Sequence, residues 1–334
     1  MPFRMRVIGG VDMGKALPLD FHTTVFSGEA RKTLGEDNWA YGFCKESGTI
    51  AVFDGCGGSG ARKHDDYNNH SEAFMASRIC SGAFYECIQQ HFPITTSPDV
   101  FVKQILEPYL DDVIKANVPT EKSNSIKIKG MRTLPSTMAA ALIQVESEKN
   151  LQVSPIWAGD SRVYILDATG LSQLTVDDSN QPDPMEGLYD DGTLTNVICA
   201  DKPVRLNCST FTVKAPFMVI AATDGCFGYV SSPMEFEGMI LHTMLESSNV
   251  AQWEDNLQKL IASYAGDDHT LCLASFGYGS FVSIQQEFKT RYDYLRENYL
   301  ETVWATPWED RDTRRNLWAS YRQNYLKYIE GERR

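Results

Sequence analysis

Two apolar stretches of the chain end in the same three residues. Residues 49–53 lead into Asp54-Gly55-Cys56, and residues 217–223 lead into Asp224-Gly225-Cys226. Each stretch has the composition of a strand that is buried on both faces. An Asp-Gly pair after a single strand is usually only a turn. Its recurrence after two such strands indicates that these carboxylates do more than form turns.

A third acidic motif stands beside a further apolar stretch. Asp267 and Asp268 precede residues 270–276, which we predict to form a strand. Carboxylates beside core strands cost free energy unless a cation or hydrogen bonds compensate them. Oxygen ligands alone suit Mg²⁺ or Mn²⁺ better than Zn²⁺. The glycine after Asp54 lets the backbone turn sharply and leaves space for a cation or a phosphoryl group.

The composition favours a folded protein that does not bind nucleic acid. Its 334 residues are 43% hydrophobic, which is ample for one large domain with an appendage or for two modest domains. The formal net charge is -13, and no block rich in Lys and Arg could follow a nucleic-acid backbone. This charge would also repel a phosphorylated substrate, so any phosphate site needs cations close by.

The cysteines and the amino terminus predict a cytoplasmic protein. Eight cysteines are spread along the chain without a CxxC pair, and several lie inside apolar periodic segments, as reduced core thiols do. The first residues lack the continuous apolar block of a secretory signal. No stretch of about 18 apolar residues could span a bilayer. We therefore expect no membrane contact.

Helix and strand patterns alternate along the chain. Apolar periodicity predicts helices over residues 71–92, 99–118, 233–245 and 250–264. The second begins at Ser97-Pro98-Asp99, and the third at a capping box, Ser232-Pro233-Met234-Glu235. Strands are predicted over residues 21–27, 137–145, 151–158 and 162–166. Residues 181–216 are rich in Pro, Gly, Asp and Asn, which fits a mobile lid that faces the substrate or, equally, a surface excursion without function.

The motifs, in their order, resemble those of the metal-dependent type 2C protein serine/threonine phosphatases. The resemblance runs through most of the first 276 residues. It implies a compact α/β sandwich of two central, mostly antiparallel sheets flanked by helices. A catalytic domain is expected over residues 1–277 and a C-terminal helical extension over residues 278–334. The motifs that carry the resemblance are Glu36-Asp37-Asn38, Asp54-Gly55, Ser136-Thr137-Met138-Ala139, Gly159-Asp160-Ser161-Arg162, Leu174-Thr175-Val176-Asp177-Asp178-Ser179, Thr223-Asp224-Gly225 and Gly266-Asp267-Asp268-His269-Thr270.

The resemblance also implies a metal centre and a hydrolytic reaction. Asp54 would bridge two Mg²⁺ or Mn²⁺ ions, with the Gly55 carbonyl on one of them and with Asp224 and Asp267 on the other. A water shared by the two ions would lose its proton near neutral pH, and the resulting hydroxide would attack phosphorus. The expected substrates are proteins that carry phosphoserine or phosphothreonine.

An acidic pair and basic residues precede the predicted strand that ends at Asp54. In the resembled family the acidic pair, here Glu36 and Asp37, holds waters of the metal ions, and an arginine shortly before it binds the substrate phosphate. Arg31 lies one residue farther from Glu36 than usual, whereas Lys32 has the usual spacing. We favour Arg31, because a guanidinium can bind a phosphate through two hydrogen bonds and an ammonium acts only as a point charge.

Two further aspartates need an assignment. The doubled acid in the last motif makes its register ambiguous, and we choose Asp267 as the ligand because the family places the ligating acid three residues before a threonine, here Thr270. Asp268 would then lie behind Asp267 and support the metal centre without binding an ion directly. For Asp160 we predict a structural role, because a turn aspartate normally caps neighbouring backbone amides.

Two departures from the family pattern, at Cys56 and at Arg132, keep other functions open, and a third is found at Asp177-Asp178. Cys56 stands where the family usually has a histidine, its proposed acid for the leaving group. Arg132 stands about where a third-metal aspartate often lies, and Asp177-Asp178 lack a histidine that the family often has there. A catalytically weak or inactive scaffold that binds phosphoproteins is therefore one alternative. A small-molecule phosphomonoesterase is another.

The last part of the chain changes in character. Residues 278–334 are charged, rich in Tyr and Trp, and helical in period, with a break at Thr306-Pro307. One interpretation is a helical hairpin that packs on its own catalytic domain. The other is a surface for a partner or a second subunit, because aromatic residues dominate interface cores. The aromatic residues concerned are Trp304, Trp308, Trp318, Tyr321, Tyr325 and Tyr328.

Overall fold

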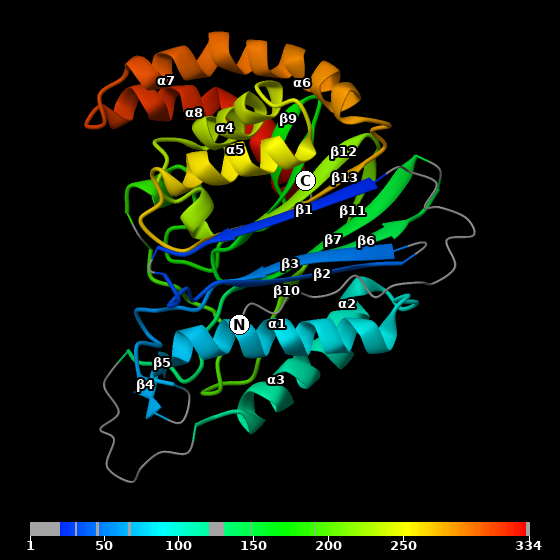
Figure 1. The fold of residues 1–334 in the computed structure, drawn as a ribbon, viewed down its shortest axis with the longest axis vertical. Helices are drawn as coiled ribbons and strands as arrows, with labels where there is room; N and C mark the ends of the chain where they lie inside the picture. Colours follow the sequence, from blue (N-terminus) through cyan, green and yellow to red (C-terminus); the bar gives the residue numbers. More distant parts are fainter. Residues whose placement is uncertain are drawn as a thin grey trace.

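A computed structural model of the chain describes residues 21–30, 32–44, 47–65, 68–119, 130–147, 149–190 and 192–331. Two antiparallel sheets pack face to face in its middle, and helices cover both outer faces (Figure 1). Helices from the first half of the chain lie on one side and helices from the second half on the other. This is the α/β sandwich that the sequence predicts.

The first sheet holds strands from both ends of the described chain. They are β1 (Phe21–Gly28), β8 (Arg162–Asp167), β9 (Gly170–Gln173), β12 (Phe217–Ala222) and β13 (His269–Phe276). Their spatial order is β1-β13-β12-β8-β9, and each neighbouring pair is antiparallel. The start of β13 therefore lies beside the end of β12, where Ala222 pairs with Leu271.

The second sheet is built from the chain between these strands. It contains β2 (Asn38–Phe43), β3 (Ser47–Phe53), β6 (Met138–Val145), β7 (Asn150–Ala158), β10 (Asn207–Cys208) and β11 (Phe211–Lys214). The order is β10-β7-β6-β3-β2, with β11 also paired to β7. A separate short hairpin joins β4 (Lys63–His64) to β5 (His70–Ser71).

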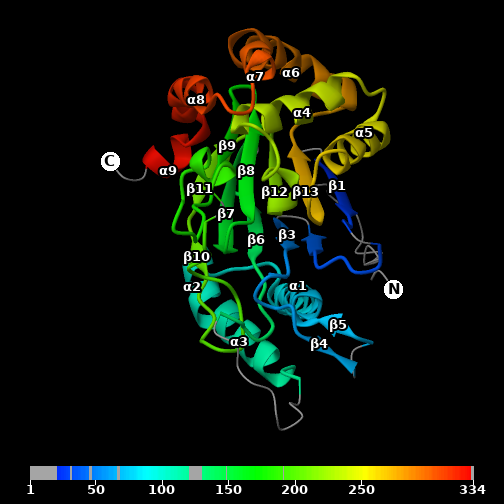
Figure 2. The same ribbon diagram turned by 90° about the vertical axis from the view of Figure 1, so that its left-hand side faces the viewer.

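The helices form the two outer layers. Those on the second sheet are α1 (Glu72–His91), α2 (Pro98–Phe101) and α3 (Glu107–Ala116). Those on the side of the first sheet are α4 (Pro233–Leu245), α5 (Val250–Ala262), α6 (Phe281–Leu295), α7 (Glu301–Ala305), α8 (Arg311–Tyr325) and α9 (Lys327–Gly331). Figure 2 shows the two layers on opposite sides of the sheets.

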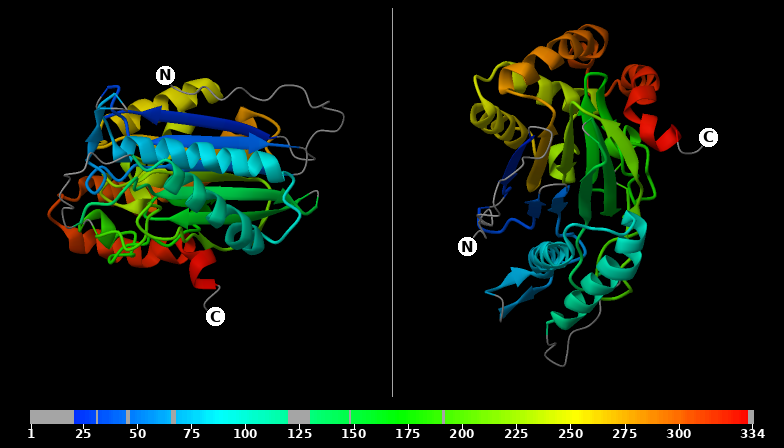
Figure 3. Two further views of the ribbon diagram at one scale, coloured as in Figure 1. Left: turned by 90° about the horizontal axis from the view of Figure 1, so that it is seen from below. Right: turned by 90° about the vertical axis from the view of Figure 1, so that its right-hand side faces the viewer.

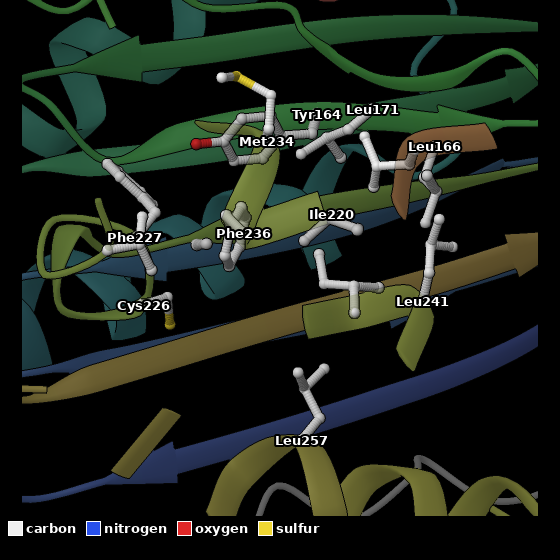
Figure 4. Close-up of a cluster of buried hydrophobic side chains, with 14 of the residues drawn as sticks. Tyr164, Leu166, Leu171, Ile220, Cys226, Phe227, Met234, Phe236, Leu241 and Leu257 are labelled. Carbon is white, nitrogen blue, oxygen red and sulfur yellow. The ribbon is translucent and has the colours of Figure 1, made fainter. Parts of the chain in front are cut away.

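The strand β3 is buried along its whole length, as its apolar sequence predicts. Ile50 and Val52 face the first sheet, and Ala51 and Phe53 face the helices on the other side. Burial on both faces explains why the run of apolar residues is continuous rather than alternating. A third apolar cluster lies between the first sheet and the second-half helices, and Figure 4 shows its centre around Tyr164, Ile220 and Phe236.

The predicted helix over residues 99–118 is not one regular helix. A π-helical turn, Val102–Leu106, separates α2 from α3, and the N–H of Glu107 reaches the carbonyl of Val102. Pro108 follows directly and has no N–H to donate to the preceding turn. A locally wider turn absorbs this missing hydrogen bond, which periodicity alone does not reveal.

The predicted capping box of α4 forms in a modified way. The hydroxyl of Ser232 accepts from the N–H of Glu235, as expected. The Glu235 carboxylate, however, accepts at 2.7 Å from the N–H of Ser231 rather than from that of Ser232. The hydrogen bond that Glu235 accepts therefore comes from one residue earlier in the chain than in the usual capping box.

The C-terminal helices pack on the body of the protein. Trp318, Tyr321 and Tyr325 are buried in the same apolar cluster as the first sheet. Trp304 and Trp308 remain 53% and 47% exposed. Packing on the chain's own sheet thus accounts for part of the aromatic set, and the predicted change in character after residue 277 falls between β13 and α6.

Within the described ranges, none of the helices has both the length and the apolar character needed to cross a bilayer.

Candidate metal centre

The acidic motifs of the sequence meet at one end of the sandwich. Asp224 follows β12, Asp267 precedes β13, and these two strands are paired. Asp54 follows β3 in the opposite sheet, whose face packs against β12 and β13 through shared apolar residues. The strands are antiparallel, so one strand ends where its neighbour begins. The topology therefore brings these three residues to the same end of the sandwich.

Asp54 is the centre of this acidic group. Burial raises the pKa of its carboxyl well above the usual value, and the charges of Asp224, Asp37, Asp160 and Asp267 raise it further, in that order. Carboxylates affect one another in this way only when they are close and poorly solvated. The five acids therefore form one electrostatic unit, which we call the acidic cluster.

The turn after Asp54 admits only glycine. A Cβ atom on Gly55 would lie 2.2 Å from the carbonyl oxygen of Ala73 and 3.0 Å from that of Glu36. The N–H of Gly55 donates to the carbonyl of Glu36 at 3.2 Å. This hydrogen bond connects the Asp54 turn to the segment that carries Glu36 and Asp37, so the predicted acidic pair is held against the predicted bridging acid.

Asp37 is buried with one satisfied oxygen and one orphan. The Thr223 hydroxyl donates to its Oδ2 at 2.8 Å, while its Oδ1 has no hydrogen-bond partner among the described residues. Burial, with smaller contributions from nearby carboxylates, raises its pKa to about 8. Burial also raises the pKa of Glu36, against the opposing effect of a hydrogen bond from the Ser71 hydroxyl.

The two candidate metal ligands of the last motif, Asp267 and Asp268, have different environments. Asp268 is buried, and its carboxylate accepts from the N–H of Ala30 at 2.7 Å and from that of Glu36 at 2.6 Å. Asp267 is exposed at the surface of a cavity. Asp268 thus fastens the segment after β1 to the start of β13. Asp267 has the more accessible carboxylate.

Asp160 is a residue whose environment the sequence analysis missed. It precedes β8, which pairs with the end of β12, and its Oδ1 is buried without a hydrogen-bond partner in the described part of the chain. Burial raises its pKa well above the usual value, followed by the charge of Asp224. A backbone hydrogen bond to the carboxylate opposes this shift, so Asp160 joins the acidic cluster without losing the capping role predicted for it. The available signal was its place at the start of a core strand.

Cations lie at the edge of the cluster. Arg31 lies outside the described residues, and Lys32 is exposed. Arg132 donates to the carbonyl of Leu194 at 3.3 Å, and its charge acts on Cys56. Arg78 of α1 was not predicted. Burial lowers its pKa, and nearby acids, including Glu29 and Asp268, oppose this effect.

Cys56 has a protonated thiol in this environment. Burial and then the charge of Asp54 raise its pKa well above the usual value. Its backbone N–H donates to the carbonyl of Pro135 at 3.1 Å, which fixes the turn beside the acidic cluster. The side chain thus occupies the predicted place beside Asp54 with its proton retained.

The acidic cluster fits a divalent cation on two observations. Two buried carboxylate oxygens, on Asp37 and Asp160, have no hydrogen-bond partner among the described residues. The cluster also repels itself, as the raised pKa of Asp54 shows. No three His, Cys, Asp or Glu side chains in the described ranges already stand as a finished metal site. The oxygen donors of the cluster are therefore of the kind that suits Mg²⁺ or Mn²⁺.

Similar folds are found among bacterial serine/threonine phosphatases of known structure. Stp1 from Staphylococcus aureus aligns over 80% of this chain and 99% of its own, with 20% identity and a TM-score of 0.55. PstP/Ppp from Mycobacterium tuberculosis covers 76% and 98%, with 17% identity and a TM-score of 0.54. The PstP catalytic domain in complex with two manganese ions covers 77% and 99%, with 18% identity and a TM-score of 0.51.

The sequence itself matches no model of a protein family and no curated protein. The structural likeness therefore establishes the fold, which is that of the serine/threonine phosphatases. This agrees with the resemblance seen in the motifs. Activity must be argued from the residues of the site, because one fold can serve several functions.

Proposed function

We propose that this protein is a metal-dependent phosphoprotein phosphatase that removes phosphate from phosphoserine and phosphothreonine. The observation that supports it best is the acidic cluster. Four other acids raise the pKa of Asp54 at the place where three core strands meet, in a fold shared with serine/threonine phosphatases. A cluster of this kind is costly to the folded protein unless cations balance it.

We assign the ligand roles from the sequence motifs, and the central place of Asp54 supports the assignment. Asp54, the most central acid, would bridge two Mg²⁺ or Mn²⁺ ions, with the Gly55 carbonyl, Asp224 and Asp267 completing the protein ligands. When bound, such ions make a water acidic enough to act as a nucleophile at neutral pH, and they neutralise charge on the phosphate. Gly55 contributes through its backbone, which only glycine can place so close to Ala73.

Asp37 and Glu36 would orient water from behind the ligands. The unpartnered Oδ1 of Asp37 can accept a hydrogen bond from a water, while Oδ2 stays fixed by Thr223. Ser71 fixes Glu36 in the same manner. Arg31 would bind two phosphate oxygens through its guanidinium group. The segment that follows Arg31 is anchored, because the N–H of Glu36 donates to the carboxylate of Asp268.

The proposed site has only a poor proton donor for the leaving group. A serine or threonine oxygen needs a proton as it leaves, and Cys56 is the predicted donor. A thiol is a poor donor even when it is protonated. A nitrophenolate leaves without a proton. We therefore expect efficient turnover of p-nitrophenyl phosphate and slower turnover of phosphopeptides, with Cys56→His improving the second more than the first.

Manganese-dependent release of phosphate from a phosphoserine peptide tests the proposal. The parent protein is expected to turn over, and Asp54→Asn is expected to keep its fold and lose activity by several orders of magnitude, since a ligand charge is removed from the reacting site. A folded, manganese-saturated Asp54→Asn variant with parental activity would show that the site is wrong. Asp112→Asn, the same change at an exposed position of α3, is the matched control.

A scaffold that binds phosphoproteins without hydrolysing them is the second candidate. The replacement of the expected histidine by Cys56 favours it. Binding of a phosphopeptide in the presence of Mn²⁺ without release of phosphate would support this alternative. Faster turnover of sugar phosphates than of phosphopeptides would instead support a small-molecule phosphomonoesterase. The exposed Trp304 and Trp308 are proposed as contacts for a protein partner or a second copy of the chain.

A further inference from the structure

A cavity opens beside the acidic cluster. It has a volume of about 350 Å³ and reaches Glu36 and Asp267, so it is continuous with the proposed metal centre. Its floor is the start of α1, with Ser71 and Phe74. Its other wall is the β4–β5 hairpin, which contributes Lys63, Asn69 and His70. Figure 3 shows this hairpin standing beside α1 at the edge of the molecule.

The hairpin is held firmly at its base. Glu72, 1% exposed, accepts from His64 at 2.8 Å and lies 3.7 Å from Arg62. Its second oxygen accepts from the N–H of Leu134 at 3.1 Å. A buried carboxylate with partners on two segments, residues 62–64 and Leu134, resists displacement. The hairpin wall is therefore present before any substrate binds, which favours a site with a defined shape.

His70 is also fixed in place. Its ring stacks on that of Phe74, with centroids 3.8 Å apart and planes 9° from parallel. The guanidinium of Arg78 lies 3.4 Å from the same centroid. Two groups this close to one ring must occupy its opposite faces. Phe74 thus separates two basic side chains, with His70 at the cavity and Arg78 towards Glu36 and Asp268.

The acids around the cavity have partners, whereas its exposed cation does not. Asp268 is engaged by two backbone N–H groups and Glu36 by the Ser71 hydroxyl. Asp267 is assigned above to the metal ions. Lys63 is exposed and has no ion-pair or hydrogen-bond partner recorded for its side chain within the described ranges. The unsatisfied charge at this wall is positive.

We propose that this cavity binds a residue next to the phosphorylated one and that Lys63, with His70, selects an acidic side chain there. The inference rests on the proposed function and names its preferred substrates, which are phosphopeptides with a flanking Asp or Glu. The volume is sufficient for one such side chain and part of its backbone. In a protein with a formal charge of -13, a local cation is also needed to bring an acidic peptide to the site.

A series of phosphoserine peptides tests this inference. The peptides carry a single Asp, Ala or Lys at successive positions on each side of the phosphoserine, and kcat/KM is measured with Mn²⁺. At one or more positions the Asp peptide is expected to exceed the Lys peptide about two- to fivefold, the ratio that one solvent-exposed ion pair supports. Equal values at all positions, or a preference for Lys, would overturn the inference.

Variants assign the preference to the hairpin. Lys63→Glu should reverse the ratio of the Asp peptide to the Lys peptide, Lys63→Arg should retain it, and His70→Asn should reduce it. Lys149→Glu makes the same charge change at the far end of β7 and should leave the ratio as in the parent. An unchanged ratio in Lys63→Glu would contradict the proposed role, provided that its thermal unfolding matches that of the parent.

The peptide preference of the cavity can still be tested if the protein does not hydrolyse peptides. Fluorescence anisotropy of the same labelled peptides, with and without Mn²⁺, measures their affinity directly. Tighter binding of the Asp peptide that Lys63→Glu reverses would support the cavity while the phosphatase proposal fails. Hydrolysis of all peptides at one rate, with one affinity, would leave the phosphatase proposal standing and reject the cavity.

Discussion

The guanidinium of Arg315 grips the carboxylate of Glu186 through two hydrogen bonds of 2.6 Å each. Arg315 belongs to α8, and Glu186 lies in the Pro- and Gly-rich segment between β9 and β10. Beside this pair, the rings of Tyr189 and Trp308 meet edge to face at 5.9 Å. The C-terminal part of the chain therefore holds the segment between β9 and β10 in place.

Reversing this ion pair should give a measurable coupling. Arg315→Glu alone is expected to lower the melting temperature slightly, because it sets two like charges together at the surface. Adding Glu186→Arg should restore most of the loss, since the geometry of the pair is planar and reciprocal. A melting series of the two single variants and the double variant checks this. Full additivity of the two changes would show that the contact contributes nothing.

A second ion pair, between Arg291 and Glu237, should matter far more. Its side chains are 9% and 0% exposed, and two hydrogen bonds of 2.6 and 2.9 Å join them. Arg291→Leu leaves a buried carboxylate without its cation, which typically costs about 3–5 kcal/mol. Urea unfolding measures the loss. The double variant Arg291→Met with Glu237→Met should recover much of it, because no charge is then left buried.

The neighbouring acids Asp267 and Asp268 should separate in their effects. Asp268→Ala removes the acceptor for two backbone N–H groups and should cost about 2–4 kcal/mol of stability. Asp267→Ala should leave the melting temperature of the metal-free protein nearly unchanged and weaken Mn²⁺ binding in calorimetry. A larger loss of Mn²⁺ affinity in a folded Asp268→Ala variant would reverse the assignment.

The metal-free protein should lose stability as pH rises. Burial holds the pKa of Asp37 at about 8 in the folded protein, against an ordinary value of 3.8. Between these limits the folded chain binds more protons than the unfolded chain, so the free energy of unfolding falls with increasing pH. The raised pKa of Asp54 and of Asp160 acts in the same direction.

Melting temperatures in a chelator, measured at several pH values between those two limits, check this expectation. Excess Mn²⁺ should raise the melting temperature most at the upper limit, where the acidic cluster has lost its protons. In Asp54→Asn the dependence on pH should be shallower. A parent protein whose stability rises steadily with pH in the chelator would contradict the placement of these acids in a shared buried site.

The continuous apolar runs predicted the core strands closely, because burial on both faces leaves a distinct composition. The predicted strand over residues 151–158 became Asn150–Ala158, and the stretch before Asp224 gave Phe217–Ala222. The acidic motifs were informative for the same reason, since a carboxylate directly after such a run is rarely placed there by packing alone.

Asp160 shows where this reasoning stops. Its sequence context, a Gly-Asp turn between two strands, describes a capping aspartate equally well, and only the pairing of β8 with β12 brings it to Asp224. The half-buried Arg78 could not be predicted either, because the acids near it come from distant segments. In the C-terminal extension, composition marked the aromatic residues without separating the buried Tyr325 from the exposed Trp304.

The pairing of β1 with β13 has a consequence for how the protein is made. The N–H of Ala30 and the carboxylate that receives it on Asp268 are 238 residues apart. A ribosome delivers the chain from its amino end, so β1 and the Glu36 segment emerge long before the strand that holds them. Until then β1 has no partner strand, because it pairs with β13. The acids of the proposed site are also still dispersed along an incomplete chain. The proposed metal centre can therefore form only when nearly the whole sheet is complete, and an enzyme built as we propose would stay inactive until its synthesis was almost finished.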